Sequence, residues 1–249
     1  MRIHVLTAWH NEAALAPFFL RHYAYADKIV VIMGSDTTDN SREVCARFPN
    51  VEIEEFEFPG GLLDDDVKIE KFNSMTAAQK CDWVMVLDAD EFIWPAAGES
   101  PQRFLARQIG VGANLVHAVM YQVYRHESEG PLDPALPVAG QRRHGKRAPH
   151  HVKPIIVRPE TGILWTPGNH HYALRPEIRE SSEIFVGVHW AYADAEIAIA
   201  RYVHGRKERM SRANLQKRHG WHTFDLTPES IRAECEAHAH DPEIFGAEA

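Results

Sequence analysis

The first 90 residues alternate between short apolar runs and longer segments whose apolar residues recur at helical spacing. The apolar runs, rich in strand-forming residues, predict strands over 3–8, 28–33, 51–58 and 83–87. The segments between them predict helices over 12–25, 39–48 and 67–80. This alternation is typical of a parallel sheet covered by helices, whose inner strands are apolar throughout because both faces are buried. We therefore predict an α/β fold with a mostly parallel central sheet flanked by helices.

The second half of the chain is less regular. Its apolar runs predict strands over 114–124, 152–157, 163–165 and 184–190. The prolines and glycines of 125–150 favour a loop, 193–219 predicts one or two basic helices, and a small helix with an acidic tail is expected from residue 225. There is no internal repeat and no linker. We expect one domain over 1–249, with an elaborated C-terminal half.

Three acids follow directly on the fourth predicted strand, in the stretch CDWVMVLDADEFIWP (81–95). Alternate residues at a strand end point the same way, so Asp88 and Asp90 are expected to converge. Two close carboxylates repel unless a cation lies between them, and Mg²⁺ or Mn²⁺ with a substrate phosphate suits such a pair. Ligands of open parallel sheets bind beyond the carboxyl ends of the strands. The stretch predicts a metal–diphosphate site, with helix capping or surface ion pairs as the alternative.

Composition narrows the partners. The 249 residues carry a formal net charge of −8, which argues against nucleic acid as the main partner. Three cysteines far apart suggest neither a disulfide framework nor a cysteine-rich zinc site, and fit a reducing cytoplasm. The N-terminus lacks a signal-peptide pattern, and no window approaches the ~20 apolar residues of a membrane span. We expect a cytoplasmic protein with at most peripheral membrane contact.

Several motifs occur together in a specific order. They are HNE (10–12) after the first strand, GSDTTDNS (34–41) after the second, Lys68, Lys71 and Asn73 before the fourth, and DWVMVLDADEF (82–92). In this order they resemble the family 2-like glycosyltransferases of the GT-A fold. The resemblance covers the first 95 residues well and continues more loosely through KPIIVRP, GNHHY and VHWAY. It implies a nucleotide-binding half over 1–95 and an acceptor-side half over 96–249 with basic C-terminal helices.

The resemblance also implies which residues bind the donor. Asp36 would face the base or ribose of a nucleotide, with Glu12 nearby. Lys68 or Lys71 would neutralise the charge of the diphosphate. Asp88 would contact the ribose, or the metal through water.

For the metal shell, the resemblance implies Asp90 as a ligand and a histidine from a late strand. We expect that histidine to be His189, with His170 and His171 as the next candidates. Imidazole suits Mn²⁺ better than Mg²⁺, and either ion is a candidate cofactor.

The implied activity is metal-dependent transfer of a sugar from a nucleotide-diphospho-sugar to an unknown saccharide or lipid-linked acceptor, with inversion. The metal and a few cations would stabilise the negative charge that builds on the leaving diphosphate. Inversion requires a general base, for which we hypothesise Glu91. Glu91 orienting Lys71 or capping the next segment is an open alternative, and Asp133 and Asp194 are further candidates for the base.

Two basic segments have both a functional and a structural interpretation, and three other functions are compared with sugar transfer. The run at 141–147 and the segment 201–218 would contact diphosphate, an anionic acceptor or an acidic membrane surface, or would simply be solvated.

A sugar nucleotidyltransferase would typically carry a glycine-rich loop after the first strand, where AWHNEAA has no glycine. A non-catalytic carbohydrate- or nucleotide-binding protein would not require the intact acidic set. A metallohydrolase would require two histidines flanking an acid on one helix, a pattern absent from the sequence.

Overall fold

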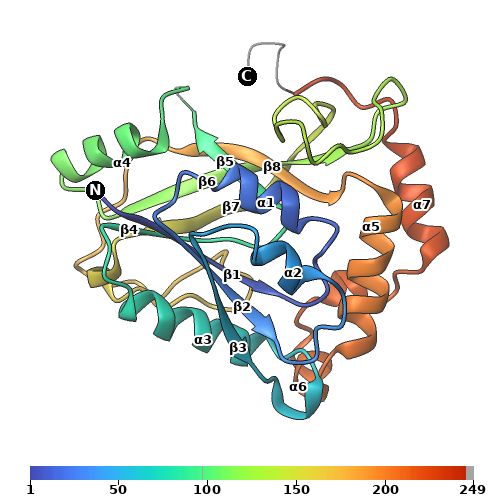
Figure 1. Cartoon of the computed structure of the whole chain (residues 1–249), viewed down its shortest axis with the longest axis horizontal. Helices are drawn as coiled ribbons and strands as arrows, with labels where there is room; N and C mark the ends of the chain where they lie inside the picture. The colour runs from blue at the N-terminus through green and yellow to red at the C-terminus, as the bar shows by residue number, and fades with distance from the viewer. Residues whose placement is uncertain (97, 245–249) are drawn as a thin grey trace.

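The computed structural model describes residues 1–96 and 98–244, without the side chains at positions 149 and 150. The strands are β1 (Ile3–Trp9), β2 (Lys28–Gly34), β3 (Val51–Phe56), β4 (Trp83–Val86), β5 (Glu91–Pro95), β6 (Leu115–Tyr124), β7 (Gly145–Val157) and β8 (Phe185–Tyr192). They form one sheet in the order β3-β2-β1-β4-β7-β6-β8-β5 (Figure 1). The strands β3, β2, β1 and β4 are mutually parallel, β6 is parallel to β8, and β7 and β5 run antiparallel to their neighbours. The predicted α/β fold with a mostly parallel sheet is confirmed.

Helices lie on both faces and at one end of this sheet. The α-helices are α1 (Ala16–His22), α2 (Ser41–Cys45), α3 (Asp65–Ala78), α4 (Pro101–Gly110), α5 (Ala195–Ala198), α6 (Arg212–Lys217) and α7 (Pro228–Ala237). A π-helix, η3 (Ile199–Arg206), continues α5, and the short 3₁₀ turns are η1 (Pro59–Gly61), η2 (Pro159–Thr161), η4 (Lys207–Arg209) and η5 (Trp221–Thr223). Among the described residues, none of the helices combines the length and the apolar character that a membrane span requires.

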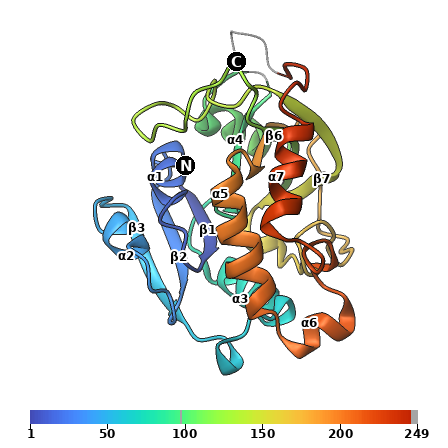
Figure 2. The same ribbon diagram turned by 90° about the vertical axis from the view of Figure 1, so that its right-hand side faces the viewer.

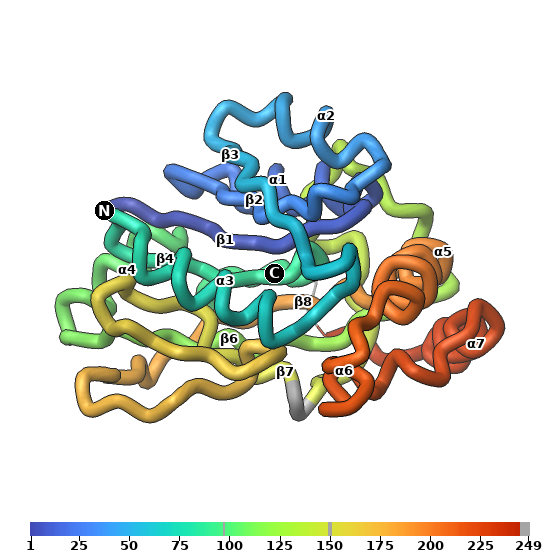
Figure 3. Tube along the Cα trace, turned by 90° about the horizontal axis from the view of Figure 1, so that it is seen from below, coloured from blue at the N-terminus to red at the C-terminus, as the bar shows by residue number. Residues whose placement is uncertain are grey.

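The inner parallel strands bury alternate residues in two separate apolar cores. On β1, Ile3 and Val5 enter the core that holds α1 and α2, whereas Leu6 enters the core of α3. On β4, Trp83 and Met85 face the first core and Val84 and Val86 the second. Both faces of these strands are therefore dry, and this explains why their sequences are apolar throughout. Figure 3 shows α1 and α2 on one side of β1 and β2.

The turn between β4 and β5 requires a curled sheet. Only four residues separate the two strands, yet three other strands lie between them in the sheet order. Four steps between strands span about 19 Å in a flat sheet, and this chain segment would reach about 18 Å if fully extended. It is not extended, because Glu91 N–H donates to the carbonyl of Asp88 at 3.1 Å. The curl brings β5 back beside the end of β4, and the residues FIWP (92–95) lie in this strand.

Several sequence predictions in the second half were wrong. Residues 145–151 form the first part of β7 instead of a loop, although they are basic and contain a proline. Pairing with β6 overrides their weak strand preference, and Gly145 permits it because a Cβ there would lie 2.1 Å from the carbonyl oxygen of Gln122. Residues 163–165 form only an isolated bridge, between Trp165 and Tyr172, and α4 was not predicted.

The basic segment 193–219 folds into α5, η3, η4 and α6 and packs at the carboxyl ends of the parallel strands, with α7 beside it. Figures 1 and 2 show this orange and red layer at the end of the sheet to which β1 and β2 point. The predicted small helix is α7, and residues 245–249 of the predicted tail lie outside the described residues. The layer matters because it covers the sheet edge where the predicted site residues lie.

Candidate active site

Acids from the ends of two parallel strands lie together under this layer. Glu12 follows β1, and Asp88, Asp90 and Glu91 follow β4. We call these four acids, together with Lys68, Lys153, His189, Arg201 and Tyr202, the strand-end cluster. Four carboxylates face three permanent cations, so the cluster has a formal charge of −1 with neutral histidine.

Asp90 lies at the centre of the cluster and is buried. Its Oδ2 atom accepts hydrogen bonds from the Arg201 guanidinium and from the Tyr202 hydroxyl, the latter at 3.0 Å. His189 Nε2 lies 3.2 Å from the same oxygen. Burial disfavours ionisation of Asp90, but the Arg201 guanidinium, together with His189 when its ring is protonated, outweighs it and holds the pKa of this carboxyl well below the usual range. Asp90 is thus a carboxylate whose charge the surrounding residues maintain.

Arg201 links Asp90 to Glu12. Its Nε atom lies 2.8 and 3.0 Å from the two carboxylate oxygens of Glu12. Burial opposes the charge on the guanidinium, but Asp90 and Glu12 outweigh it and raise the pKa of Arg201 well above its ordinary value. For Glu12 burial is the dominant effect, and its pKa rises to about 7 despite the ion pair. One cation from η3 therefore joins acids that follow two different strands.

Asp88 and Glu91 share the second buried cation. Lys153, from β7, is ion-paired with Glu91 Oε1 and lies 3.8 Å from Asp88 Oδ2. The other oxygen of Glu91 accepts from the backbone N–H of Asp88 at 3.0 Å. Asp88 Oδ1 also accepts from Lys68 Nζ at 2.7 Å. Both oxygens of Glu91 are engaged inside the protein, and the Glu91 side chain is 2% exposed, so this residue positions Asp88 and Lys153.

The pKa values of Asp88 and Lys153 follow their ion pairs, whereas burial outweighs Lys153 at Glu91 and raises the pKa of that carboxyl. Burial opposes the charge on Asp88, but Lys68 and Lys153 outweigh it and lower the pKa of this carboxyl. Burial likewise opposes the ammonium of Lys153, but Glu91 and Asp88 outweigh it and raise the pKa of this group. Charged forms are held in a dry site only because each has a partner of opposite sign.

The other predicted donor residues separate into two places. Asp36 follows β2, is partly exposed and pairs with Arg209 Nη2 at 2.6 Å, with His10 Nε2 at 3.7 Å. Lys71 points to Glu54 on β3, at 2.9 Å, instead of to Asp88. Of the two lysines expected near a diphosphate, the structure brings only Lys68 to the acids that follow β4.

Asp90 and His189 together fit a divalent cation. His189 Nδ1 lies 2.9 Å from Gln122 Oε1, and the amide nitrogen of Gln122 donates to two backbone carbonyls, so the oxygen faces the imidazole. The histidine therefore donates from Nδ1, and in the neutral ring the Nε2 lone pair faces Asp90. Two acceptors at 3.2 Å require a proton or a metal ion between them. His151 adds a buried Nδ1 without a hydrogen-bond partner among the described residues, on a ring 4.5 Å from that of His189.

Asp88 does not complete that set of ligands. Among the described residues, the only group of three side chains whose ligand atoms all lie within 4.8 Å of one another is elsewhere in the molecule. The Asp88 carboxylate lies 2.7 Å from Lys68 Nζ and 3.8 Å from Lys153 Nζ, and these lysines are its ion-pair partners. Of the other predicted ligands, His170 stacks at 6.2 Å on His151, and His171 is exposed.

Four members or neighbours of the site were missed in the sequence: Lys153, Arg201, Tyr202 and His151. The only signal for Lys153 was an unpaired charge in the apolar run of 152–157. Arg201 was one of seven basic residues in the segment 201–218, and nothing in their spacing separates it from the solvated ones. Its inward direction depends on η3, whose wider π-helical turn lets two consecutive side chains reach Asp90.

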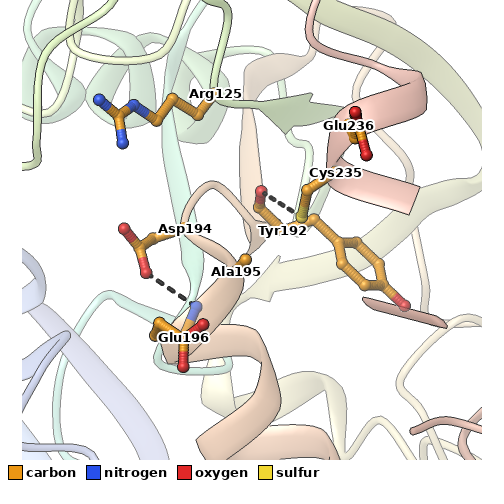
Figure 4. Close-up of a pocket in the computed structure, with 7 residues that line it drawn as sticks. All are labelled: Arg125, Tyr192, Asp194, Ala195, Glu196, Cys235 and Glu236. Atoms are coloured by element: carbon orange, nitrogen blue, oxygen red, sulfur yellow. Dashed lines mark hydrogen bonds between the residues drawn. The ribbon is translucent and has the colours of Figure 1, made fainter. Parts of the chain in front are cut away.

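A cavity of about 290 Å³ lies near the start of α5, outside the strand-end cluster (Figure 4). Its lining comprises Arg125, Tyr192, Asp194, Ala195, Glu196, Cys235 and Glu236. Asp194 Oδ1 accepts from the backbone N–H groups of Glu196 and Ile197 at 3.0 and 3.2 Å. This acid, one of the candidates for the general base, is therefore the N-cap of α5.

No family model matches the chain, and no curated protein sequence is similar to it. Solved structures similar to it include residues 1–349 of TarS from S. aureus, at 15% identity and a TM-score of 0.44 over 82% of this chain and 65% of that one. Another is glucosyl-3-phosphoglycerate synthase from Mycobacterium tuberculosis with Mn²⁺, uridine diphosphate and phosphoglyceric acid, at 16% identity and a TM-score of 0.38 over 68% and 60%. A third is 4-diphosphocytidyl-2C-methyl-D-erythritol synthase from Anaerococcus prevotii, at 9% and 0.35 over 64% and 72%.

The first two of these proteins are glycosyltransferases of the GT-A type, which the sequence resembles. The chain spans less than two thirds of the length of either.

Proposed function

We propose that this protein transfers a glycosyl group from a nucleotide-diphospho-sugar to an acceptor, with a divalent cation held between Asp90 and His189. The observation that carries the proposal is the strand-end cluster. Its acids lie where ligands of open parallel sheets bind, and each of them faces a cation or a histidine. A site of this kind is suited to an anion that arrives together with a metal ion.

The charge of the cluster supports this assignment. Its formal charge of −1 repels a free diphosphate, whereas one bound divalent cation makes the site positive. When bound, the metal would supply Lewis-acid stabilisation to the leaving diphosphate. Asp90 and His189 are the residues that would hold it, since their two acceptor atoms already face each other at 3.2 Å.

The basic residues of the site are of two kinds, which differ in the exposure of the acids that they pair with. Lys153 and Arg201 are buried against two acids each, so we assign them a positioning role. Lys68 and Arg209 pair with Asp88 and Asp36, acids whose side chains are 36% and 39% exposed. The Lys68 and Arg209 side chains are 21% and 15% exposed, and a phosphate group can replace the exposed acids that they pair with. We assign these two side chains to the diphosphate, and Asp36 and Asp88 to the nucleoside.

Glu91 as the general base stays a prediction, and the contacts of Glu91 favour a different role. A base must reach the acceptor hydroxyl within about 3 Å, whereas both oxygens of Glu91 bind Lys153 and the Asp88 backbone. We propose that Glu91 holds Asp88 at the end of β4. Glu91→Gln would then weaken donor binding through Asp88, while loss of turnover with unchanged donor binding would restore the base assignment.

A thermal-shift screen of nucleoside diphosphates and nucleotide sugars, with and without Mn²⁺, tests the proposal. A ligand that binds only the folded state raises the midpoint. At least one nucleoside diphosphate is expected to stabilise the protein more with Mn²⁺ than without it, and Asp90→Asn should remove the metal-dependent part. Asp66→Asn is the matched control, because Asp66 pairs with the exposed Lys217 outside the cluster.

The screen has a second stage and a clear failure. Any sugar nucleotide that stabilises the protein is incubated with it, and release of the nucleoside diphosphate is followed with and without saccharide acceptors. Faster release in the presence of an acceptor is the expected result. If no nucleoside diphosphate shifts the midpoint under any metal, the protein does not use such a donor.

A further inference from the structure

A second group of metal-ligating side chains lies just beyond the end of β6, where the loop after Tyr124 meets the segment after α7. Ligand atoms of His126, Glu127 and His240 all lie within 4.8 Å of one another. We propose that these three side chains bind one divalent transition-metal ion of the Zn²⁺ class. The set shares no residue with the strand-end cluster, so the proposal is independent of the proposed activity.

The chemistry of the donors selects the class of ion. Two imidazoles and one carboxylate are a ligand set for tetrahedral Zn²⁺, with water at the fourth position. Metal–ligand bonds of about 2.0–2.2 Å place neighbouring ligand atoms roughly 3.3–3.6 Å apart in a tetrahedron. His240 Nδ1 already lies 3.4 Å from Glu127 Oε1. Hard cations such as Mg²⁺ prefer an all-oxygen set, which this site does not offer.

The backbone holds both sides of the site in place. Glu127 N–H donates to the carbonyl of Ala239 at 3.1 Å, directly between the ligands. The segment after α7 is also held by residues at or just before the start of β7, since Gly145 N–H donates to the carbonyl of Pro242 and Ile244 N–H to that of Arg143, at 3.1 and 2.8 Å. The three ligands therefore need only side-chain rotations to close on an ion.

The ring of His126 is also oriented by its neighbours. Its Nδ1 atom lies 2.7 Å from the Ser128 hydroxyl and 3.2 Å from the Ser128 backbone nitrogen. The ring stacks on that of His144 at 4.0 Å, and His144 is fixed by Glu129 at 2.8 Å. The Ser128 backbone N–H donates to Nδ1, so these contacts hold the ring beside Glu127 and His240, and an ion bound at Nδ1 would take the place of that N–H. The bound ion would tie the segment after α7 to the loop after β6.

Calorimetric titration of the metal-free full chain with Zn²⁺ tests the proposal, with Asp90→Asn as the background so that the first site does not contribute. His126→Ala and His240→Ala should each weaken binding roughly tenfold or more, a loss of the size seen when the supporting residues of metal sites are removed. Glu127→Gln gives a third variant, and both Glu127 and His240 are mostly exposed, so neither change threatens folding. His204→Ala is the matched control, since His204 is exposed and pairs with Glu208 alone.

A second readout separates a site from scattered histidine binding, which matters in a chain with 16 histidines. Zn²⁺ should raise the unfolding midpoint of the background protein and of His204→Ala, but not that of the two other histidine variants. Zn²⁺ affinity that is the same in all variants, or absent from the background protein, would overturn the proposal.

Discussion

The two halves of the chain contribute opposite charges to one site. The acids of the strand-end cluster, Glu12, Asp88, Asp90 and Glu91, all belong to the first 95 residues and follow parallel strands. Most of their partners come from the second half: Lys153 from β7, His189 from β8 and Arg201 from η3. Only Lys68 is supplied by the first half.

This difference has a physical origin. A strand that is buried on both faces leaves its first polar residues at the sheet edge, so the position of the acids is fixed by local sequence. The cations reach the same edge only through tertiary packing of the C-terminal layer.

Arg201→Met should have the largest effect on stability. It removes one cation from two buried acids, Glu12 and Asp90, and breaking a buried pair in this way costs about 3–5 kcal/mol. Arg232→Met is the control, because Arg232 pairs with Glu196 where both side chains are more than half exposed, and such pairs contribute about 0–1 kcal/mol. Urea unfolding of both variants measures the difference. Equal effects would mean that the second half does not hold the acids.

Lys153→Met should lower the free energy of unfolding by about 3 kcal/mol. This is the lower end of the range for a broken buried ion pair, because Glu91 keeps its hydrogen bond from Asp88 N–H. Replacing both partners by apolar side chains is often neutral, so the double variant Lys153→Met/Glu91→Leu should recover much of that loss. A double-mutant cycle from urea unfolding gives the coupling. Additive effects of the two changes would show that Lys153 and Glu91 do not act as a pair.

His22 provides a pH test within the first half, where its partly buried imidazole donates to the carbonyl of Ile93 at 3.0 Å instead of facing an acid as His189 does. Burial lowers the pKa of His22 from 6.5 to about 4. The folded state then resists protonation that the unfolded chain accepts, so stability present above pH 6.5 is lost as the pH falls towards 4. The loss from this residue is on the order of 2–3 kcal/mol at pH 4.5.

The measurement for His22 compares urea unfolding at pH 7.5 and pH 4.5. His22→Gln keeps a hydrogen-bond donor but does not titrate. On acidification to pH 4.5 this variant should lose about 2–3 kcal/mol less stability than the unmodified protein. An identical pH dependence in the two proteins would show that His22 is not held neutral by burial.

Arg209→Met should have the smallest effect on stability, within about 1 kcal/mol, because its partner Asp36 is 39% exposed. Its effect on binding is expected to be larger, since we assign Arg209 to the diphosphate. Titration with the nucleoside diphosphate found in the screen should show weaker binding in this variant than in Lys217→Met, whose charge lies outside the site. Unchanged binding would remove Arg209 from the proposed donor site.

The difference between the two halves also explains which features of the fold and the site could be predicted from the sequence. The parallel strands and the acids at their ends follow from apolar runs of sufficient length. The strand β5 was not predicted because FIWP has too few residues to show a period, and its pairing with β8 depends on the curl of the sheet. The acids Asp88 and Asp90 were expected to share one cation, whereas the structure gives each its own partners.

The cations were harder to identify, for a general reason. Seven basic residues lie between 201 and 218, and the sequence gives them equal standing. The π-helical turn and the packing of η3 direct Arg201 inward, while His204 and Lys217 point to solvent. Which basic side chain points inward depends on the tertiary structure, and no local sequence pattern predicts it.

The proposed donor site is tested most directly by a crystal structure of the full chain grown with Mn²⁺ and the nucleoside diphosphate found in the screen, in which anomalous scattering locates the metal. The account predicts Mn²⁺ bonded to Asp90 and His189, with the diphosphate in contact with Lys68 or Arg209. Mn²⁺ and the nucleotide bound away from the ends of β1 and β4, or a nucleotide that contacts none of these four side chains, would contradict it.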